Sequence, residues 1–583
     1  MKDVSPSKVC TLYVPPKAIV TLIEKVNMIF VLSLSIGIGY GLYFVLPENS
    51  MTTYISEKGL MPGLVNEKFN NKMHGFSDRN GIYKKLKHDA SNKNRSLVIK
   101  EIIEDMGYRG HLQDYNYLKY DRNISNRNVY TIVKCVRGPC TESIVLVVPL
   151  SMKYIESQIM TLELLNYFNS LTNWSKNVIF FFTPDFIGTQ AFLSAYYNQD
   201  HPNIQYQSLE FSSGDLIGGV VLNLSGRKFS RVNIQYNMIN GRYPNLDWFN
   251  GIVRILEKFD LKTSIHTPKI ERTIKDLDPL TYHGKHCLRS ILSQAFLETE
   301  NFHSLFGLHC ISMVTLQSDF NNGNGHVTIN SMTEVVEATI RALNNLDERF
   351  HHSYQFYLLT SCHNFLSIAY YEPMIGFLCL PLLLKALANY YSISLNFKFP
   401  LSFLLTYLYS LFLYFISTYF YFIELTSIVL LFSTFLPLLF IPFIHPSTTH
   451  RFVVNLLIPL SLGAISLLNF SFALIFALIY SPIAFIVIGS GGDLYDDNNN
   501  NNKILLRFLK FIKILLLLIL HPYILYICCQ VYSNNFDINN PSYDNFITPL
   551  KALIHNHVYH YSFNFPLFLV SIIPIWHCII FSI

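Results

Sequence analysis

Apolar residues are distributed very unevenly along this chain of 583 residues. One uncharged apolar segment, 27–46, lies near the N-terminus, and a segment of mixed polarity follows it up to about residue 355. The remainder is apolar almost throughout. At about 1.5 Å per residue, segment 27–46 is long enough to cross a hydrocarbon core about 30 Å thick. The pattern predicts an integral membrane protein with one large domain outside the membrane.

The C-terminal part, 369–583, divides into further apolar segments of spanning length, which gives about eight expected spans in total. Before them, the aromatic segment 356–368 predicts an amphipathic helix that lies at the membrane interface. Together these segments predict an all-α polytopic bundle. The expected C-terminal spans are 369–389, 401–419, 422–443, 452–469, 471–489, 508–530 and 563–583.

Basic residues indicate the orientation of these spans. The N-terminal tail, 1–26, carries more lysines than acidic residues, and the loops expected on its side hold most of the basic residues of the C-terminal part. Because positive loops stay in the cytosol, we expect a cytosolic N-terminus and a lumenal domain, 47–355, in the endoplasmic reticulum. Segment 27–46 lacks a small-residue cleavage site and is therefore predicted to be a signal anchor.

A lumenal location predicts two covalent modifications. Asn94, Asn123 and Asn173 stand in Asn-x-Ser sequences, which accept N-linked glycans. Cys135 and Cys140 flank a turn between two strand-like runs. An oxidising lumen favours a disulfide between them, and two buried thiols are the alternative.

Strand-like and helix-like segments alternate within 47–355. The runs 143–150, 178–183 and 216–224 are continuously apolar, and segments of helical period lie between them. Such an alternation is typical of a mostly parallel sheet that is covered on both faces. We therefore predict an α/β lumenal domain of the doubly wound type.

Ligands of such sheets bind beyond the carboxyl ends of the strands, where this chain offers few ionisable residues. Ser151–Lys153 follow the first strand, Asp185 the second and Asn223 the third, and His326 lies in a late loop. Zinc needs at least three protein ligands, so Asp185 and His326 are weak metal candidates, and Asp185 equally fits a helix N-cap. We predict no catalytic residue, metal or cofactor in this chain.

Four stretches of the sequence are similar to a known family. They are NGRYPNLDWFN (240–250), TESIVLVVP (141–149), RALNNLDERFHHSYQFYLL (341–359) and FLSIAYYEPMIGFLCLPLLLKAL (365–387). With its single N-terminal span, lumenal domain and polytopic part, the chain resembles the GPI-anchor attachment proteins, the large polytopic subunits of GPI transamidase. The resemblance implies a lumenal domain similar to the M28 zinc aminopeptidases, with most metal ligands lost.

The resemblance also implies a function and partners. The complex attaches GPI anchors to precursor proteins that carry a C-terminal signal, and a different, caspase-like cysteine protease subunit supplies the nucleophile. This chain would bind the GPI glycolipid and scaffold that catalytic subunit, without being an enzyme itself. Two alternatives stay open: an active membrane-bound M28-type metallo-aminopeptidase, and a transporter. Nucleic acid is not an expected partner, because lysine and arginine are not interleaved with aromatic residues.

Candidate contacts with GPI lie in the C-terminal part. His521 interrupts a long apolar segment, and a polar residue inside a membrane is by default a functional candidate, although a hydrogen bond between helices also explains it. Aromatic residues at the expected lumenal ends of the last spans, and one within the last span, either form an interface belt or contact the glycolipid. These residues are Tyr532, Tyr543, Tyr559, Tyr561, Phe563 and Trp576.

Overall fold

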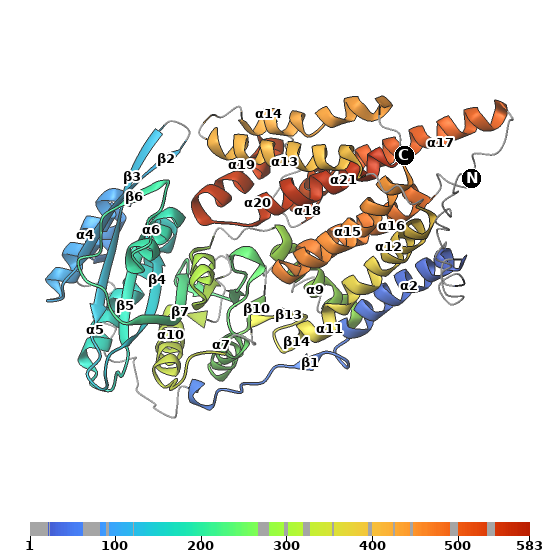
Figure 1. The fold of residues 1–583 in the computed structure, drawn as a ribbon. Coiled ribbons are helices and arrows are strands. Elements are labelled where there is room, and N and C mark those ends of the chain that lie inside the picture. The colour runs from blue at the N-terminus through green and yellow to red at the C-terminus, as the bar shows by residue number, and fades with distance from the viewer. Residues whose placement is uncertain are drawn as a thin grey trace, which may run out of the picture.

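The computed structural model places a sheet domain at one side of a helical bundle, and the start of α2 and the end of α21 lie at the part of the bundle away from the sheet (Figure 1). It describes residues 21–583 except 22–23, 62–81, 89–91, 120–121, 266–278, 297–300, 319–326, 352–354, 394–398, 422, 424–425, 444–446, 490–499 and 533–542.

Nine strands form one mixed sheet, in the order β10-β9-β11-β7-β4-β5-β3-β2-β6. The four central strands β11, β7, β4 and β5 are parallel to one another, whereas β3, β2 and β6 add antiparallel on one side and β9 on the other. The predicted α/β domain with a mostly parallel sheet is therefore confirmed. The strands are β2 (His111–Lys119), β3 (Arg122–Val133), β4 (Glu142–Pro149), β5 (Asn177–Thr183), β6 (Ile204–Tyr206), β7 (Asp215–Asn223), β9 (Val232–Gln235), β10 (Thr263–Ile265) and β11 (Ser312–Ser318).

Helices cover both faces of this sheet. Along β4, Val145 and Val147 join one core cluster with Phe192, and Ile144 and Leu146 join a second cluster. This division follows from the alternation of side chains along a strand, and it explains why the central strands are apolar at every position. One face carries α5 (Ile155–Ser170), α7 (Leu246–Lys258) and α10 (Ile329–Asn344), and the other carries α6 (Phe186–Tyr196) and the 3₁₀ helix η5 (Phe302–His309).

The bundle contains fewer full spans than expected. Within the described residues, six helices are long and apolar enough to cross a membrane, and seven if the bent pair 508–529 counts as one. The expected span 422–443 is wrong as a single helix, because it divides into a short α-helix and a 3₁₀ helix that contains Pro437 and Pro442. The helices are α2 (Val26–Val45), α12 (Pro373–Ser392), α13 (Leu401–Tyr419), α14 (Thr426–Ser433), η7 (Leu436–Phe443), α15 (Thr448–Leu468), α16 (Phe470–Gly489), α17 (Asn500–Ile519), α18 (Pro522–Tyr532), α19 (Tyr543–His560), α20 (Asn564–Pro566), the π-helix η8 (Leu567–Ile572) and α21 (Ile573–Phe581).

The amphipathic helix expected at 356–368 is also wrong. This segment forms a hairpin of β13 (Tyr357–Leu359) and β14 (Asn364–Ser367), and β14 pairs with β1 (Met51–Thr52), which follows α2. The strands that adjoin the first two spans therefore pair with each other. Aromatic spacing alone could not reveal this pairing, because the partner strand is about three hundred residues away in the sequence.

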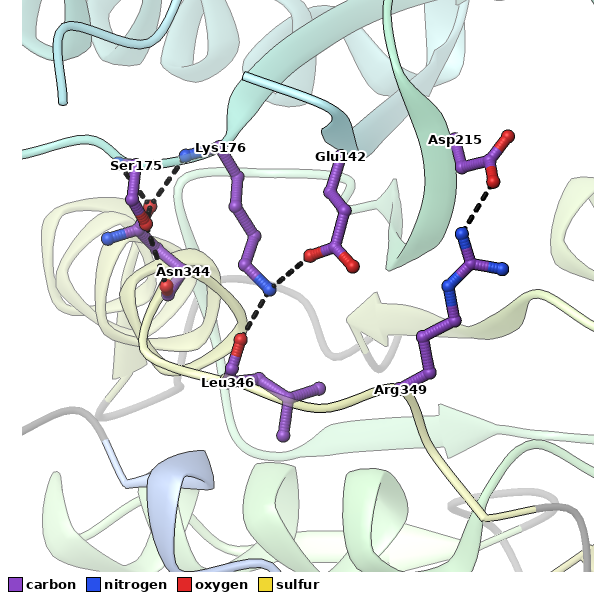
Figure 2. Close-up of polar contacts among 7 residues, drawn as sticks. All are labelled: Glu142, Ser175, Lys176, Asp215, Asn344, Leu346 and Arg349. Atoms are coloured by element: carbon purple, nitrogen blue, oxygen red, sulfur yellow. Dashed lines mark hydrogen bonds and ion pairs between the residues drawn. The ribbon is translucent and has the colours of Figure 1, made fainter. Parts of the chain in front are cut away.

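Polar contacts close the amino ends of the central strands (Figure 2). The Lys176 ammonium, which is buried, lies 2.7 Å from the Glu142 carboxylate and donates to the Leu346 carbonyl at 2.5 Å. The Asn344 side-chain oxygen accepts from the backbone N–H groups of Ser175 and Lys176, at 2.9 and 3.1 Å. The chain that leaves α10 is thereby fixed beneath β4 and β5.

Candidate functional site

The carboxyl ends of the central strands lie at the opposite edge of the sheet, where Asp185 follows β5. Asp185 is the N-cap of α6, and its carboxylate accepts hydrogen bonds from the Gly188 N–H at 2.7 Å, the Tyr115 hydroxyl at 2.5 Å and the Asn126 amide at 2.7 Å. Burial raises the pKa of Asp185, and these donors act in the opposite direction. The carboxylate is therefore engaged by the fold itself.

The other positions considered from the sequence do not complete a metal site. Asn223 ends β7 and is buried, and Ser151–Lys153 lead into a 3₁₀ turn with Met152 exposed. His326 lies outside the described residues. Over the ranges that the structure covers, no three His, Cys, Asp or Glu side chains come together as metal ligands.

Side-chain amides lie at this edge instead. Gln317 is paired in register with Asn223 of the neighbouring parallel strand. The Gln235 side chain donates to the Gln317 oxygen at 2.7 Å, and the Asn223 side chain donates to the Asn301 oxygen at 3.4 Å. We call Asn223, Gln235, Asn301 and Gln317 the amide row. Of these four residues, only Asn223 stands at a position that the sequence marks, because the other three are ordinary polar residues until the strands bring them together.

The end of α19 docks on the sheet domain. The His201 ring donates from Nε2 to the Tyr559 carbonyl at 3.0 Å, and the Tyr559 hydroxyl donates to the Leu118 carbonyl. The Asn240 side chain donates to the Tyr561 carbonyl at 3.2 Å and accepts from the Phe563 N–H at 2.6 Å. Tyr559 is fully buried in this contact, whereas Tyr561 and Phe563 are 40% and 44% exposed.

A second contact joins the domain to the hairpin of α15 and α16. The Asn469 side chain donates to the Gln294 carbonyl at 3.1 Å, and the Ser471 hydroxyl donates to the Gln294 side-chain oxygen. Gly241 has a φ of +69°, and a Cβ there would lie 2.8 Å from Asn469 Cγ, so only glycine fits this approach. The two contacts adjoin each other, because the Gln294 side chain donates to the Gly241 carbonyl at 2.5 Å and the Asn564 side chain donates to the Ala295 carbonyl at 3.4 Å.

A break in the bundle occurs at His521–Pro522, where α17 and α18 meet at 44°. Proline lacks an N–H, so carbonyls of the preceding turn lose their helical donors. The Trp576 indole donates to the Leu517 carbonyl at 2.9 Å, and the Tyr480 hydroxyl donates to the Leu520 carbonyl at 2.8 Å. Side chains of neighbouring helices thus replace the lost bonds, as an apolar surrounding requires.

His521 itself lies in the wall of an apolar pocket. Its ring stacks on Phe435 and meets Trp576 edge-on, both with centroids 4.5 Å apart, and its Nε2 lies 3.4 Å from the Thr434 hydroxyl. The empty space among these side chains, counted up to its open side, is about 260 Å³, and it is narrow enough to hold only about one water molecule. It is lined by Leu430, Leu431, Thr434, His521, Tyr523, Leu550, Phe565, Phe568 and Leu569.

Comparison with known proteins identifies the family. The model of the family described as "Gaa1-like, GPI transamidase component" matches residues 125–580. The chain belongs to this Gaa1-like family. The family predicted from the sequence is thereby confirmed, and with it the role as a component of GPI transamidase.

Two Gaa1 relatives match most of the chain. The GPI transamidase component gaa1 of Schizosaccharomyces pombe is 28% identical over 482 residues, which cover 79% of this chain and 82% of the relative. GAA1 of Saccharomyces cerevisiae is 28% identical over 465 residues, which cover 74% and 71%. Neither name describes the catalytic chemistry or the ligand of this Gaa1-like chain.

Solved structures with some likeness include two peptidases. The LapA aminopeptidase of Legionella pneumophila covers 51% of this chain and 78% of its own, at 9% identity and a TM-score of 0.31. A putative zinc-dependent exopeptidase of Bacteroides vulgatus covers 48% and 99%, at 13% identity and a TM-score of 0.28. Because both TM-scores lie below 0.5, nothing about the site is inferred from either structure.

The remaining predicted residues are placed as follows. Tyr532 ends α18 and Tyr543 begins α19, and their side chains lie outside the described residues, as does that of Asn94 in α4 (Asn92–Asp105). Asn123 and Asn173 are exposed, so both are accessible for glycosylation. The sulfurs of Cys135 and Cys140 are joined as a disulfide across the turn before β4.

Proposed function

We propose that this Gaa1-like chain binds the GPI glycolipid in its membrane bundle and holds the catalytic subunit of GPI transamidase beside it. The observation that carries the proposal is the pocket at the broken helix. Its walls are apolar and suit contact with an acyl chain that lies along the surface of the bundle, while His521 and Thr434 put polar atoms at the same place. A buried polar residue inside a membrane bundle is costly unless it serves packing or function.

The two contacts between domain and bundle support a scaffold role. Phe565, Phe568 and Leu569 of the pocket follow directly after Phe563, which is bonded to Asn240 of the sheet domain. A catalytic subunit held on the sheet domain would therefore keep a fixed distance from the lipid. Fixing an amine and an acyl-enzyme close together raises their effective concentration and favours aminolysis over hydrolysis.

We further propose that the sheet domain lies in the lumen of the endoplasmic reticulum, that the N-terminus is cytosolic and that this chain is not itself catalytic. The start of α2 and the end of α21 both lie away from the sheet, which supports an even number of crossings (Figure 1). The engagement of Asp185 as a helix cap supports a structural role for this carboxylate at the carboxyl edge. The caspase-like cysteine protease subunit would supply the nucleophile.

Crosslinking in the intact complex tests this proposal. A photoactivatable GPI analogue is expected to label α18, α20 and η8, as read by mass spectrometry of peptides. Leu550→Trp fills the pocket and should lower labelling about tenfold, a loss equivalent to about 1.4 kcal/mol of binding free energy. The matched control is Leu405→Trp, on the exposed face of α13, which should leave labelling unchanged.

Co-purification of the catalytic subunit with both variants would show that the complex is intact. Equal labelling of wild type and Leu550→Trp would refute the pocket as the lipid site. Stoichiometric zinc together with chelator-sensitive peptidase activity of the purified chain would refute the non-catalytic role.

A further inference from the structure

The amide row differs from the surrounding core in leaving strong acceptors unpaired. The side-chain oxygens of Asn223 and Gln235 are buried, and neither has a hydrogen-bond partner among the described residues. Asn223 is 4% exposed, while Gln235, Asn301 and Gln317 are partly exposed, so the row reaches solvent. An unpaired buried carbonyl oxygen costs about 1–3 kcal/mol, a cost that a ligand with donor groups removes.

The fold holds this row firmly. His303 lies on η5, two residues after Asn301, and is fully buried. Its Nδ1 is 2.7 Å from the Thr315 hydroxyl, and its Nε2 is 2.9 Å from the Asn237 carbonyl. Thr315 is paired in register with Gln235, so the same bonds fix both ends of the row. The amides are thus ordered before any ligand arrives, which lowers the entropic cost of binding.

The row lies close to the place where the bundle meets the domain. Phe302 follows Asn301 and its ring is 6.3 Å from that of Phe186, which is 4.6 Å from the ring of His560 at the end of α19. Phe565, which lines the pocket, is five residues after His560 in the sequence. The row therefore lies on the side of the sheet domain that meets the end of α19.

We propose that the amide row is a subsite for the hydroxyl groups of the GPI glycan. The inference rests on the proposed function and names the part of the glycolipid that the sheet domain contacts. Carboxamides both donate and accept, which matches sugar hydroxyls. All four residues of the row are uncharged, so none of them supplies a counter-charge for an ammonium group. The row therefore selects neutral glycan rather than phosphoethanolamine.

Ligand-observed NMR on the purified complex tests the subsite. The probes are lipid-free mannotriose and free phosphoethanolamine. Mannotriose should give a saturation-transfer signal with wild type that falls at least fivefold in Asn223→Leu and in Asn301→Ala. Asn301 is partly exposed and its side chain does not cap η5, so its replacement leaves the fold intact. The matched control is Gln205→Leu on the exposed edge strand β6, which should keep the full signal.

The outcomes separate this inference from the proposed function. The subsite is overturned if the GPI analogue labels the bundle but the mannotriose signal is unchanged in both row variants. That result would still support the lipid site. Loss of GPI labelling in wild type refutes the proposed function, whatever mannotriose does. A row-dependent signal from phosphoethanolamine instead of mannotriose overturns the assignment to hydroxyls. If neither mannotriose nor phosphoethanolamine gives a signal with the wild type, the subsite is overturned, and only solvent contacts the row.

Discussion

At the amino edge of the central strands, the buried Lys176 has both an ion-pair partner and a carbonyl acceptor, and Asn344 accepts two backbone N–H groups (Figure 2). At the carboxyl edge, the buried oxygens of Asn223 and Gln235 have no described partner. Glu142 and Lys176 adjoin β4 and β5, whereas Asn223 and Gln235 end β7 and β9, and all four strands belong to one sheet. Satisfied polar groups stabilise a fold, whereas unsatisfied ones persist where a ligand completes them.

The largest expected effect comes from breaking the amino edge. Lys176→Ala removes the partner of a mostly buried Glu142 and the donor to Leu346, and should lower the free energy of unfolding of the sheet domain by about 3 kcal/mol. Thermal unfolding followed by the fluorescence of Trp174 and Trp248, both buried in this domain, measures the loss.

The matched control at the same edge is Arg349→Ala. Arg349 and Asp215 form an ion pair at 2.5 Å, but both side chains are more than half exposed. Water screens such a pair, so the control should change stability by less than about 1 kcal/mol. Equal losses for Lys176→Ala and Arg349→Ala would show that burial is not what distinguishes the two contacts.

Acid should weaken the carboxyl edge. Burial lowers the pKa of His303 from its ordinary 6.5 to about 3, so the folded state favours the neutral ring. The contribution of the neutral ring to the free energy of unfolding is complete above about pH 6.5 and is lost as the pH falls from there towards 3. At pH 5 the loss is about 2 kcal/mol. His303→Gln should make the free energy of unfolding depend less on pH in this range. An unchanged dependence on pH would show that His303 is not the group that titrates.

The break between α17 and α18 resembles the amino edge, because its polar groups also have specific hydrogen-bond partners, here inside the bundle. Trp576→Phe keeps an aromatic ring but removes the donor to the Leu517 carbonyl, and should destabilise the bundle by about 1 kcal/mol. Hydrogen exchange of the 517–523 amides should become faster than in wild type. Trp576→Phe with unchanged exchange would mean that Leu517 does not depend on this bond.

The smallest expected effect is at the amide row, and its sign is opposite. Asn223→Leu replaces an amide whose oxygen is buried and unpaired, and should leave the sheet domain equally stable or more stable by about 0.5–1 kcal/mol. The same thermal unfolding experiment measures it. A loss above about 1 kcal/mol would mean that the carboxyl edge is structural like the amino edge.

Part of the fold could be predicted from local pattern. The order β4, α5, β5, α6 and β7 follows from continuously apolar runs that alternate with helical periods, because a parallel sheet must be covered on both faces. The cap role of Asp185 was one of two interpretations, and only its three donors distinguish them. The hairpin β13–β14 was not predictable, because its partner β1 is distant in the sequence.

The sequence by itself determined the membrane character of this chain, its family and the alternation of strands and helices in the sheet domain, because hydrophobic period and length act locally. Only the tertiary structure decided that Tyr559 is buried against Leu118 and that Trp576 replaces a lost bond at the broken helix. It also decided that Gln235 and Gln317 meet Asn223, since strand register brings together residues that no local pattern relates.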